Sequence, residues 1–156
     1  MSLYQNIINL LQKNNIQYQE FDHDPILSYE DAERERKKFN WQGVESKNVF
    51  MKGKDGNYYV FLTIAGQKVD FEKLKELIGT RCSIASHEDV ENIIKCVPGC
   101  VIPFGFAENI TIIIDPQIFD HNQYLFSPGQ TDKTIQINPN DLKIIFEKLS
   151  NKIFFF

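Results

Sequence analysis

The sequence predicts an α+β fold, in which a mixed and largely antiparallel β-sheet is flanked by helices. Segments with apolar residues at helical spacing alternate along the chain with short β-rich segments. Two of the β-rich segments, 47–52 and 57–64, are joined by a turn that contains Asp55-Gly56, a strong signal for a hairpin. The 156 residues show no internal repeat or linker, so we expect one domain over residues 1–156.

The N-terminal elements are predicted to be a helix, a strand and a second helix. Leucine and isoleucine recur at helical spacing over 3–13, and residues 17–21 alternate like a strand. Ser28 is followed three residues later by Asp31, a variant of the N-terminal capping signal. This signal predicts a charged helix that runs to about Lys38.

The later elements are predicted from capping and turn residues. Asp70 and Ser86 each begin a helix as N-cap, and Gly79 ends the first of these helices. The predicted elements are a helix at 70–78, a strand at 82–85, a helix at 86–96, strands at 110–114, 123–126 and 134–137, and a helix at 139–149.

Composition excludes several classes of protein. Hydrophobic residues make up 42% of the chain, with 13 Phe and 6 Tyr, so the chain is not intrinsically disordered. The apolar runs are strand-sized, short of the roughly 18–20 residues that span a membrane, and the N-terminus lacks a secretory signal. Cys82, Cys96 and Cys100 are odd in number and form no disulfide framework. We therefore expect a cytoplasmic protein without membrane association.

The charge is unevenly distributed. The net charge is −4, yet residues 34–75 hold ten of the 17 Lys and Arg residues against five Asp and Glu residues. Such a distribution can present a basic face to a polyanion such as nucleic acid. The alternative is that part of this charge is a solvated helix face, since Arg34, Arg36, Lys37 and Lys38 alternate with acidic residues.

Familiar catalytic constellations are not supported. Cys96, Cys100 and His87 have the atom types of a zinc site, but a fourth ligand is missing and the spacing fits no common motif. The sequence has no serine-hydrolase elbow, no phosphate-binding P-loop and no dinucleotide-binding glycine loop. We therefore expect neither a metal nor a cofactor.

Two features remain as candidate functional elements. Lys47-Asn48 begins a predicted strand inside the basic segment 34–75 and places an ammonium group next to an amide. A lysine there can also serve to protect an edge strand from aggregation. The segment 97–105 carries two prolines and two glycines around an apolar stretch. In such a stiff loop the main-chain N–H groups are free to point at a carbonyl or an oxyanion, although a plain connection between elements is the alternative.

Several motifs occur in an order that is characteristic of one family. They are Ser46-Lys47-Asn48-Val49-Phe50-Met51-Lys52, Lys54-Asp55-Gly56, Val69-Asp70, Ser83-Ile84-Ala85-Ser86 and Pro98-Gly99-x-x-x-Pro103-Phe104-Gly105. Together they resemble the YbaK/prolyl-tRNA synthetase editing-domain family of aminoacyl-tRNA deacylases. His23-x-Pro25 followed by Ser28-x-Glu30-Asp31-Ala32 is similar to the N-terminal signature of that family. The resemblance extends over about residues 17–149 and favours the free-standing, trans-editing branch.

The resemblance implies a barrel-like mixed sheet and a cytoplasmic hydrolase without a cofactor. Its substrate would be the ester bond of a misacylated tRNA, with Ala-tRNA(Pro) as the leading expectation. Cys-, Ser- or Thr-charged tRNA is the alternative, as is a tRNA-binding relative without catalytic activity. The acceptor end of the tRNA would be the main partner, and transient association with an aminoacyl-tRNA synthetase is a further expectation.

The family motifs assign roles to individual residues. The resemblance implies catalytic roles for Lys47, Asn48 and Gly99. The loop that receives the substrate carbonyl would include Cys100, Val101, Ile102 and Pro103. Further substrate-binding residues are Ile26, Leu27 and Ser127, and the expected tRNA-binding residues are Lys52, Lys54 and Lys68. Many members have Phe-His-Pro, with a histidine linked to the active site, where this chain has Phe126-Ser127-Pro128. The mechanism and substrate that the resemblance implies therefore depend on what replaces this histidine.

This chemistry does not need an enzymic nucleophile. An aminoacyl ester is already activated by the neighbouring ribose hydroxyl, so a site that holds the ester and stabilises the oxyanion suffices. Gly99 would then allow a close approach of the main chain to the ester, and Pro103 would fix the loop direction. Editing is needed because a pocket sized for proline discriminates against smaller alanine by only about 1–3 kcal/mol.

Overall fold

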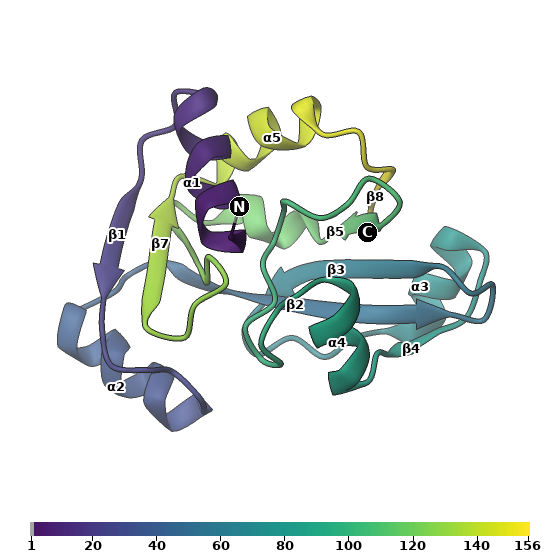
Figure 1. Cartoon of the computed structure of the whole chain (residues 1–156), viewed down its shortest axis with the longest axis horizontal. Helices are drawn as coiled ribbons and strands as arrows, with labels where there is room; N and C mark the ends of the chain where they lie inside the picture. Colours follow the sequence, from purple (N-terminus) through teal and green to yellow (C-terminus); the bar gives the residue numbers. More distant parts are fainter. Residues whose placement is uncertain (1) are drawn as a thin grey trace.

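The computed structural model describes residues 2–156 and confirms the α+β class (Figure 1). The helices of this range are α1 (Leu3–Lys13), α2 (Tyr29–Phe39), α3 (Phe71–Ile78), α4 (His87–Ile93), α5 (Pro139–Lys148) and the 3-10 helix η1 (Pro116–Asp120). The strands are β1 (Gln19–Asp22), β2 (Val44–Gly53), β3 (Tyr58–Ile64), β4 (Cys82–Ile84), β5 (Thr111–Ile114), β6 (Tyr124–Phe126), β7 (Lys133–Ile137) and β8 (Ile153–Phe155).

The sheet is mixed and open. Its strand order is β1-β7-β6-β2-β3-β5-β8, and β4 pairs with β2 off this path. Four of the pairings are antiparallel, as the sequence predicts, whereas β2–β6, β3–β5 and β5–β8 are parallel. Within residues 2–156 no pairing joins β1 to β8, so the expected barrel-like sheet does not close into a barrel. The long strand β2 connects the two halves of the sheet, which Figure 1 shows running at a steep angle to each other.

The helix boundaries follow from their caps. The side chains of Ser28, Asp70 and Ser86 accept hydrogen bonds from main-chain N–H groups in the first turns of α2, α3 and α4, as predicted. Helix α4 ends at Ile93, before the predicted Cys96. The reason is that Lys95 adopts a φ of 57° and the Cys96 N–H donates to the Val90 carbonyl, which turns the chain out of the helix.

Two elements of the structure have no counterpart in the predicted set. Helix η1 begins at Pro116 and is capped by Asp115, whose carboxylate is buried and accepts from the Thr63 hydroxyl at 2.7 Å. Strand β8 is only three residues long and is formed by pairing in parallel with β5. Both elements depend on contacts with distant residues, which local sequence patterns do not report.

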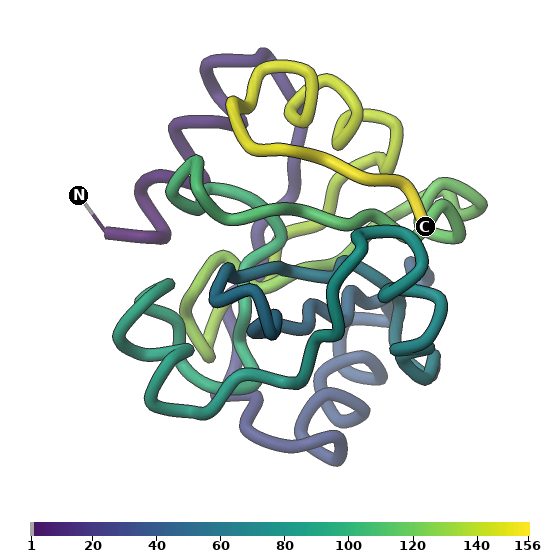
Figure 2. Tube along the Cα trace, turned by 90° about the vertical axis from the view of Figure 1, so that its right-hand side faces the viewer, coloured from purple at the N-terminus to yellow at the C-terminus, as the bar shows by residue number. Residues whose placement is uncertain are grey.

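The sheet has a buried cluster on each face. The larger cluster packs α1, α4 and α5 against Phe50, Val60 and Leu62, and the smaller packs α3 against Met51 and Phe61. Successive residues of β2 and β3 thus point to opposite faces, as expected for strands covered on both sides. In the view of Figure 2 the beginning of α1 and the end of β8 lie on opposite sides of the molecule. No helix within residues 2–156 combines the length and the apolar character that crossing a bilayer requires.

Candidate active site

A cleft of about 700 Å³ opens beside the middle of β2. Its walls come from β2, from the segment before α2, from the loop after α4 and from the turn after β6. These segments are far apart in the sequence. The cleft brings together eight of the predicted site residues, which are Ile26, Leu27, Lys47, Asn48, Gly99, Cys100, Val101 and Ser127.

Lys47 and Asn48 reach this cleft from opposite faces of β2. The Lys47 ammonium group donates a hydrogen bond to the Gln67 carbonyl at 2.6 Å. Within the described residues no carboxylate forms an ion pair with Lys47, so its positive charge is available to an anionic ligand. A main-chain carbonyl orients the ammonium group without neutralising it.

Asn48 ties the loop after α4 to β2. Its Nδ2 donates to the Val101 carbonyl at 2.9 Å, while its Oδ1 is buried without a partner among residues 2–156. Tyr124 lies next to the Asn48 side chain and is fully buried. Burial raises the pKa of Tyr124, and hydrogen bonding by the Ser46 and Asn48 side chains offsets only part of that rise. Tyr124 does not line the cleft, and nothing in its strand-sized apolar segment marks it as a neighbour of Asn48. Asn48 is therefore a positioning residue for the loop.

The loop itself begins with a tight turn. The Cys100 N–H donates to the Val97 carbonyl at 2.8 Å, with Pro98 and Gly99 at the two central positions and Gly99 at a φ of +89°. This is the arrangement of a type II turn, which requires a positive φ at its third residue. The Cys100 N–H is thus already used, contrary to the expectation that the loop amides are free. The N–H groups of Gly99 and Val101 have no partner in the described chain.

The conformation at position 99 itself requires glycine, and the predicted close approach to the substrate ester stays a prediction. A Cβ atom built there meets no atom within 4 Å, so no neighbouring group of the protein approaches closely. The left-handed φ is what favours glycine. Because Gly99 lines the cleft, the open space next to it is where a ligand would lie.

Ile102 and Pro103 do not reach the cleft. Ile102 is 0% exposed and belongs to the larger buried cluster, and Pro103 is also buried. They anchor the end of the loop in the protein interior. Ile102 and Pro103, which were predicted to contact substrate, therefore pack in the interior and do not line the cleft.

Ser127 and Cys100 both line the cleft, and their side chains are adjacent. The Ser127 hydroxyl accepts from the Gly129 N–H and donates to the Gln130 carbonyl, both at 3.2 Å. Burial raises the pKa of the Cys100 thiol, an effect that Ser127 opposes, and burial likewise raises the pKa of Cys96. These thiols are therefore neutral and poorly nucleophilic near pH 7. Within residues 2–156 no three His, Cys, Asp or Glu side chains gather as a metal-binding group.

The segment before α2 forms one rim of the cleft. The Ile26 N–H donates to the Thr131 carbonyl at 2.8 Å, and the Leu27 N–H donates to the Asp31 carboxylate at 2.9 Å. These bonds hold Leu27 in place although its side chain is 74% exposed. Trp41 also lines the cleft. Its indole N–H is buried and has no hydrogen-bond partner among the described residues.

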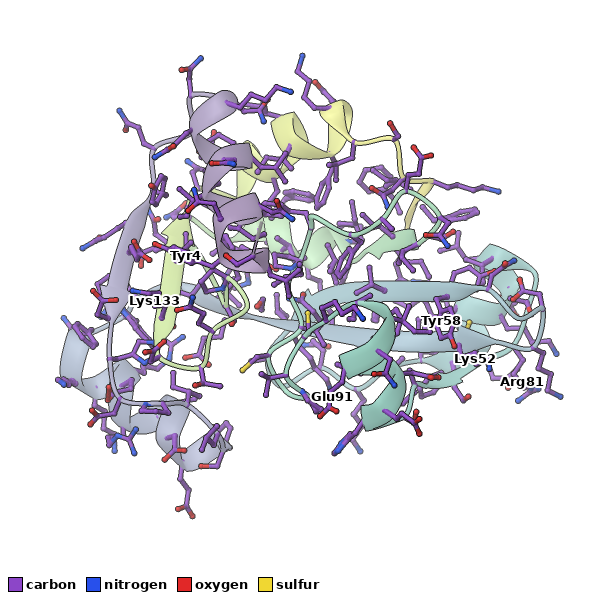
Figure 3. All side chains as sticks on the ribbon, in the orientation of Figure 1. Tyr4, Lys52, Tyr58, Arg81, Glu91 and Lys133 are labelled. Atoms are coloured by element: carbon purple, nitrogen blue, oxygen red, sulfur yellow. The ribbon has the colours of Figure 1, made fainter. Side chains whose placement is uncertain are left out.

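Part of the positive charge of residues 34–75 is used in ion pairs within the fold. Arg34 pairs with Asp31 and Glu35, and Arg36 pairs with Glu45 at 2.9 Å. Lys52, Lys54 and Lys68 do not line the cleft. Figure 3 shows Lys52 beside Tyr58 at the hairpin end of β2, where its ammonium group lies 5.7 Å from the ring centre, whereas Lys133 lies on the other half of the sheet. The predicted role of Lys52, Lys54 and Lys68 in binding tRNA stays a prediction.

The cleft brings together charged and polar groups from segments that lie far apart in the sequence. Lys47, whose ammonium group has no carboxylate partner among the described residues, lines this cleft together with Asn48, which holds the loop, and with Gly99 and Val101, while the neighbouring thiols are neutral. The family model for the aminoacyl-tRNA editing domain matches residues 23–145, and the chain belongs to this family. The family resemblance seen in the sequence is thereby confirmed.

Known proteins agree with this membership. The chain is 26% identical to the prolyl-tRNA editing protein ProX of Acetoanaerobium sticklandii, over 97% of this chain and 94% of that protein. It is 28% identical to the multifunctional Ser/Thr-tRNA deacylase ProXp-y of Escherichia coli K12, over 95% and 91% of the two chains.

Solved structures show the same fold at low sequence identity. Hypothetical protein APE2540 superposes with a TM-score of 0.81 at 13% identity, over 95% of this chain and 96% of that one. A proposed trans-editing enzyme for prolyl-tRNA synthetase superposes with a TM-score of 0.76 at 15% identity, over 98% and 95%.

Proposed function

We propose that this protein is a trans-editing aminoacyl-tRNA deacylase, which hydrolyses the ester between a small misacylated amino acid and the terminal adenosine of a tRNA. One observation carries the proposal. In a chain of the aminoacyl-tRNA editing domain family, Lys47, Asn48, Gly99 and Val101 line one cleft, and the N–H groups of Gly99 and Val101 have no partner among the described residues. The names of the two relatives, an editing protein and a deacylase, support the same activity.

Each group has a role in the proposed reaction. Lys47 binds the terminal phosphate or ribose of the tRNA, since its ammonium group has no carboxylate partner in the described residues. Asn48 holds the Val101 carbonyl and thereby keeps the loop beside the ester. The Gly99 and Val101 N–H groups polarise the ester carbonyl and stabilise the oxyanion.

The reaction needs water and no covalent enzyme intermediate. The water oxygen attacks the carbonyl carbon and gives a tetrahedral oxyanion. The bond from that carbon to the ribose oxygen then breaks, and the ribose oxygen takes up the proton that the water gives up. The free ribose hydroxyl next to the ester can orient the water. The products are the free amino acid and the deacylated tRNA.

Ala-tRNA(Pro) is the leading substrate, and Ser- or Thr-charged tRNA is the second candidate. The prolyl-tRNA editing relative supports the first. The Ser/Thr-tRNA deacylase relative supports the second, as do the hydroxyl groups of Ser46 and Ser127 on the cleft wall. A site that hydrogen-bonds a substrate hydroxyl rejects analogues that lack it far more strongly than an apolar pocket rejects a missing methylene.

A panel of charged tRNAs tests the proposal. We expect release of labelled amino acid from at least one of Ala-tRNA(Pro), Cys-tRNA(Pro), Ser-tRNA and Thr-tRNA, and no release from Pro-tRNA(Pro). Hydrolysis of the alanyl ester in preference to the seryl and threonyl esters would select the first candidate. Binding of every tRNA without release from any would contradict the proposed activity and indicate a tRNA-binding protein.

We expect the affinity for tRNA to fall steeply with salt if Lys52, Lys54 and Lys68 contact phosphates. Counterion release makes the logarithm of the binding constant linear in the logarithm of salt, and losing one phosphate contact lowers that slope by about 1. Lys52→Ala or Lys54→Ala should flatten the salt dependence of KM and leave the amino-acid preference unchanged. Lys148→Ala, at the end of α5 and outside the cleft, is the control. A KM that does not vary with salt would remove the basic face from the proposed function.

We place the protein in the cytoplasm, where its proposed substrate is made and used, and we take residues 1–156 as one editing domain. The family match over residues 23–145 supports the single domain. Transient association with an aminoacyl-tRNA synthetase stays a prediction.

A further inference from the structure

Strand β2 lacks a neighbouring strand along the middle of one edge. On one side it pairs continuously with β3, from Ser46 to Lys52. On the other side its ladder with β6 ends at Glu45, and its ladder with β4 begins at Met51. The cleft lies along this interruption, because every residue from Glu45 to Phe50 lines it.

The hydrogen bonds around the gap show which main-chain groups face it. The Glu45 carbonyl accepts from Ala65 and the Gly53 N–H donates to Asn57, so odd-numbered residues of β2 point toward β3. The Val44 N–H donates to Gln123 and the Phe50 carbonyl accepts from Ala85, so even-numbered residues point the other way. In a regular strand both main-chain groups of one residue point to the same side. The N–H and the carbonyl of Asn48 therefore both point into the gap.

Neither main-chain group of Asn48 has a partner in the described chain. The residue lies between the two ladders, and the loop after α4 forms a hydrogen bond with the side chain of Asn48, from Nδ2 to the Val101 carbonyl. Main-chain polar groups in a half-buried position normally have a hydrogen-bond partner. One donor and one acceptor are thus presented side by side at the centre of the candidate active site.

We propose that the aminoacyl group of the substrate docks on β2 as a one-residue β-bridge with Asn48. This inference rests on the proposed function. An aminoacyl ester carries an ammonium group and a carbonyl in the same order as a residue of a strand. Its carbonyl accepts from the Asn48 N–H and its ammonium group donates to the Asn48 carbonyl, as in a hydrogen-bonded pair of an antiparallel ladder. The Asn48 N–H then joins the loop amides as a donor to the oxyanion.

The shape of the gap favours a single amino acid over a peptide strand. A peptide added to a free sheet edge extends beyond the contact at both ends. Here β6 occupies the edge at Val44 and Glu45, and β4 occupies it from Met51 onward, so the ends of the gap are closed. The ligand is also flanked on two faces, by Lys47 on one and by the Asn48 side chain with the loop on the other.

The bridge also fixes the direction of the substrate side chain. Residues directly opposite in an antiparallel pair place their side chains on the same face of the sheet. An L-amino acid in this position therefore points its side chain to the face of Asn48, where Phe50 and Cys100 line the cleft. A D-amino acid with the same two hydrogen bonds points its side chain to the face of Lys47.

Hydrogen exchange of single amides tests this inference directly. The probe is 3′-amino-3′-deoxyadenosine acylated with alanine. An amide bond replaces the ester bond in this compound, so the probe is not hydrolysed in an ester-cleaving site. We expect the Asn48 amide to exchange rapidly in the free protein and at least about tenfold more slowly when the probe is bound. The amides of Lys47 and Val49 are matched controls, because they face β3 and stay slow in both states.

Two further probes examine the ammonium group and the stereochemistry. The propionyl analogue lacks the ammonium group, and we expect it to bind about 10- to 100-fold more weakly, the usual effect of losing a hydrogen bond from a charged group. The D-alanyl isomer should also bind more weakly than the L-isomer. Binding of the L-alanyl probe that shifts the loop amides but leaves the Asn48 amide fast would overturn this inference and leave the proposed function intact. Failure of every probe to bind would count against the proposed function itself.

Discussion

Replacing Lys47 with alanine is expected to lower kcat/KM for deacylation by about 10²-fold, the effect of losing one charge-assisted contact to the substrate. The ammonium group lies in the cleft, and in the described residues its partner is the Gln67 carbonyl rather than a carboxylate. That bond is exposed to solvent, so the free energy of unfolding should change by less than about 1 kcal/mol. The measurement is single-turnover hydrolysis of charged tRNA, together with urea unfolding of both proteins.

Two variants make this result specific. Lys47→Arg keeps the charge but changes its geometry, and we expect partial activity. Lys148→Ala removes the same charge outside the cleft and should behave like the wild type. Wild-type turnover by the Lys47→Ala protein would show that the role implied by the family motif does not apply to this chain.

Gly99→Ala is expected to reduce kcat by about 10²-fold, the typical effect of losing an oxyanion contact. The physical reason is the φ of +89° at Gly99, which sets the geometry of the 97–100 turn beside the cleft. In the proposed function the N–H groups of Gly99 and Val101 donate to the oxyanion from this turn. An alanine in this conformation costs roughly 1–2 kcal/mol, which the turn can avoid by shifting its amides. The measurement is kcat at saturating charged tRNA, with the unfolding free energy determined in parallel.

Gly56→Ala is the matched control for this variant. Gly56 has a φ of +86°, a Cβ there also meets nothing within 4 Å, and the residue lies in the hairpin turn outside the cleft. The two alanines should therefore cost similar stability, while only the one at position 99 lowers kcat. Cys100→Ser should leave kcat nearly unchanged, since we assign that thiol no chemistry. An active Gly99→Ala protein with an inactive Cys100→Ser protein would indicate a thiol-dependent enzyme and refute the main-chain donor mechanism.

Much of the fold was predictable because its signals are local. The caps at Ser28, Asp70 and Ser86 and the Asp55-Gly56 turn depend on neighbouring residues alone, and the structure has the predicted elements at all of them. Strand β8 and helix η1 were not predictable in this way. Their stabilising contacts with β5 and Thr63 come from residues far along the chain.

The sequence by itself determined the family, the α+β class and most residues of the candidate site. Lys47, Asn48 and the Pro98-Gly99 loop were recognisable because their residue types and order are distinctive. Tertiary structure alone decided that the sheet stays open, that Ile102 and Pro103 lie in the interior, and that the Cys100 N–H is used within its own turn. It also decided that β2 keeps one unpaired stretch of edge at Asn48. The physical reason is that pairing of strands and burial of side chains depend on which distant segments meet, whereas a motif reports only the residues next to one another.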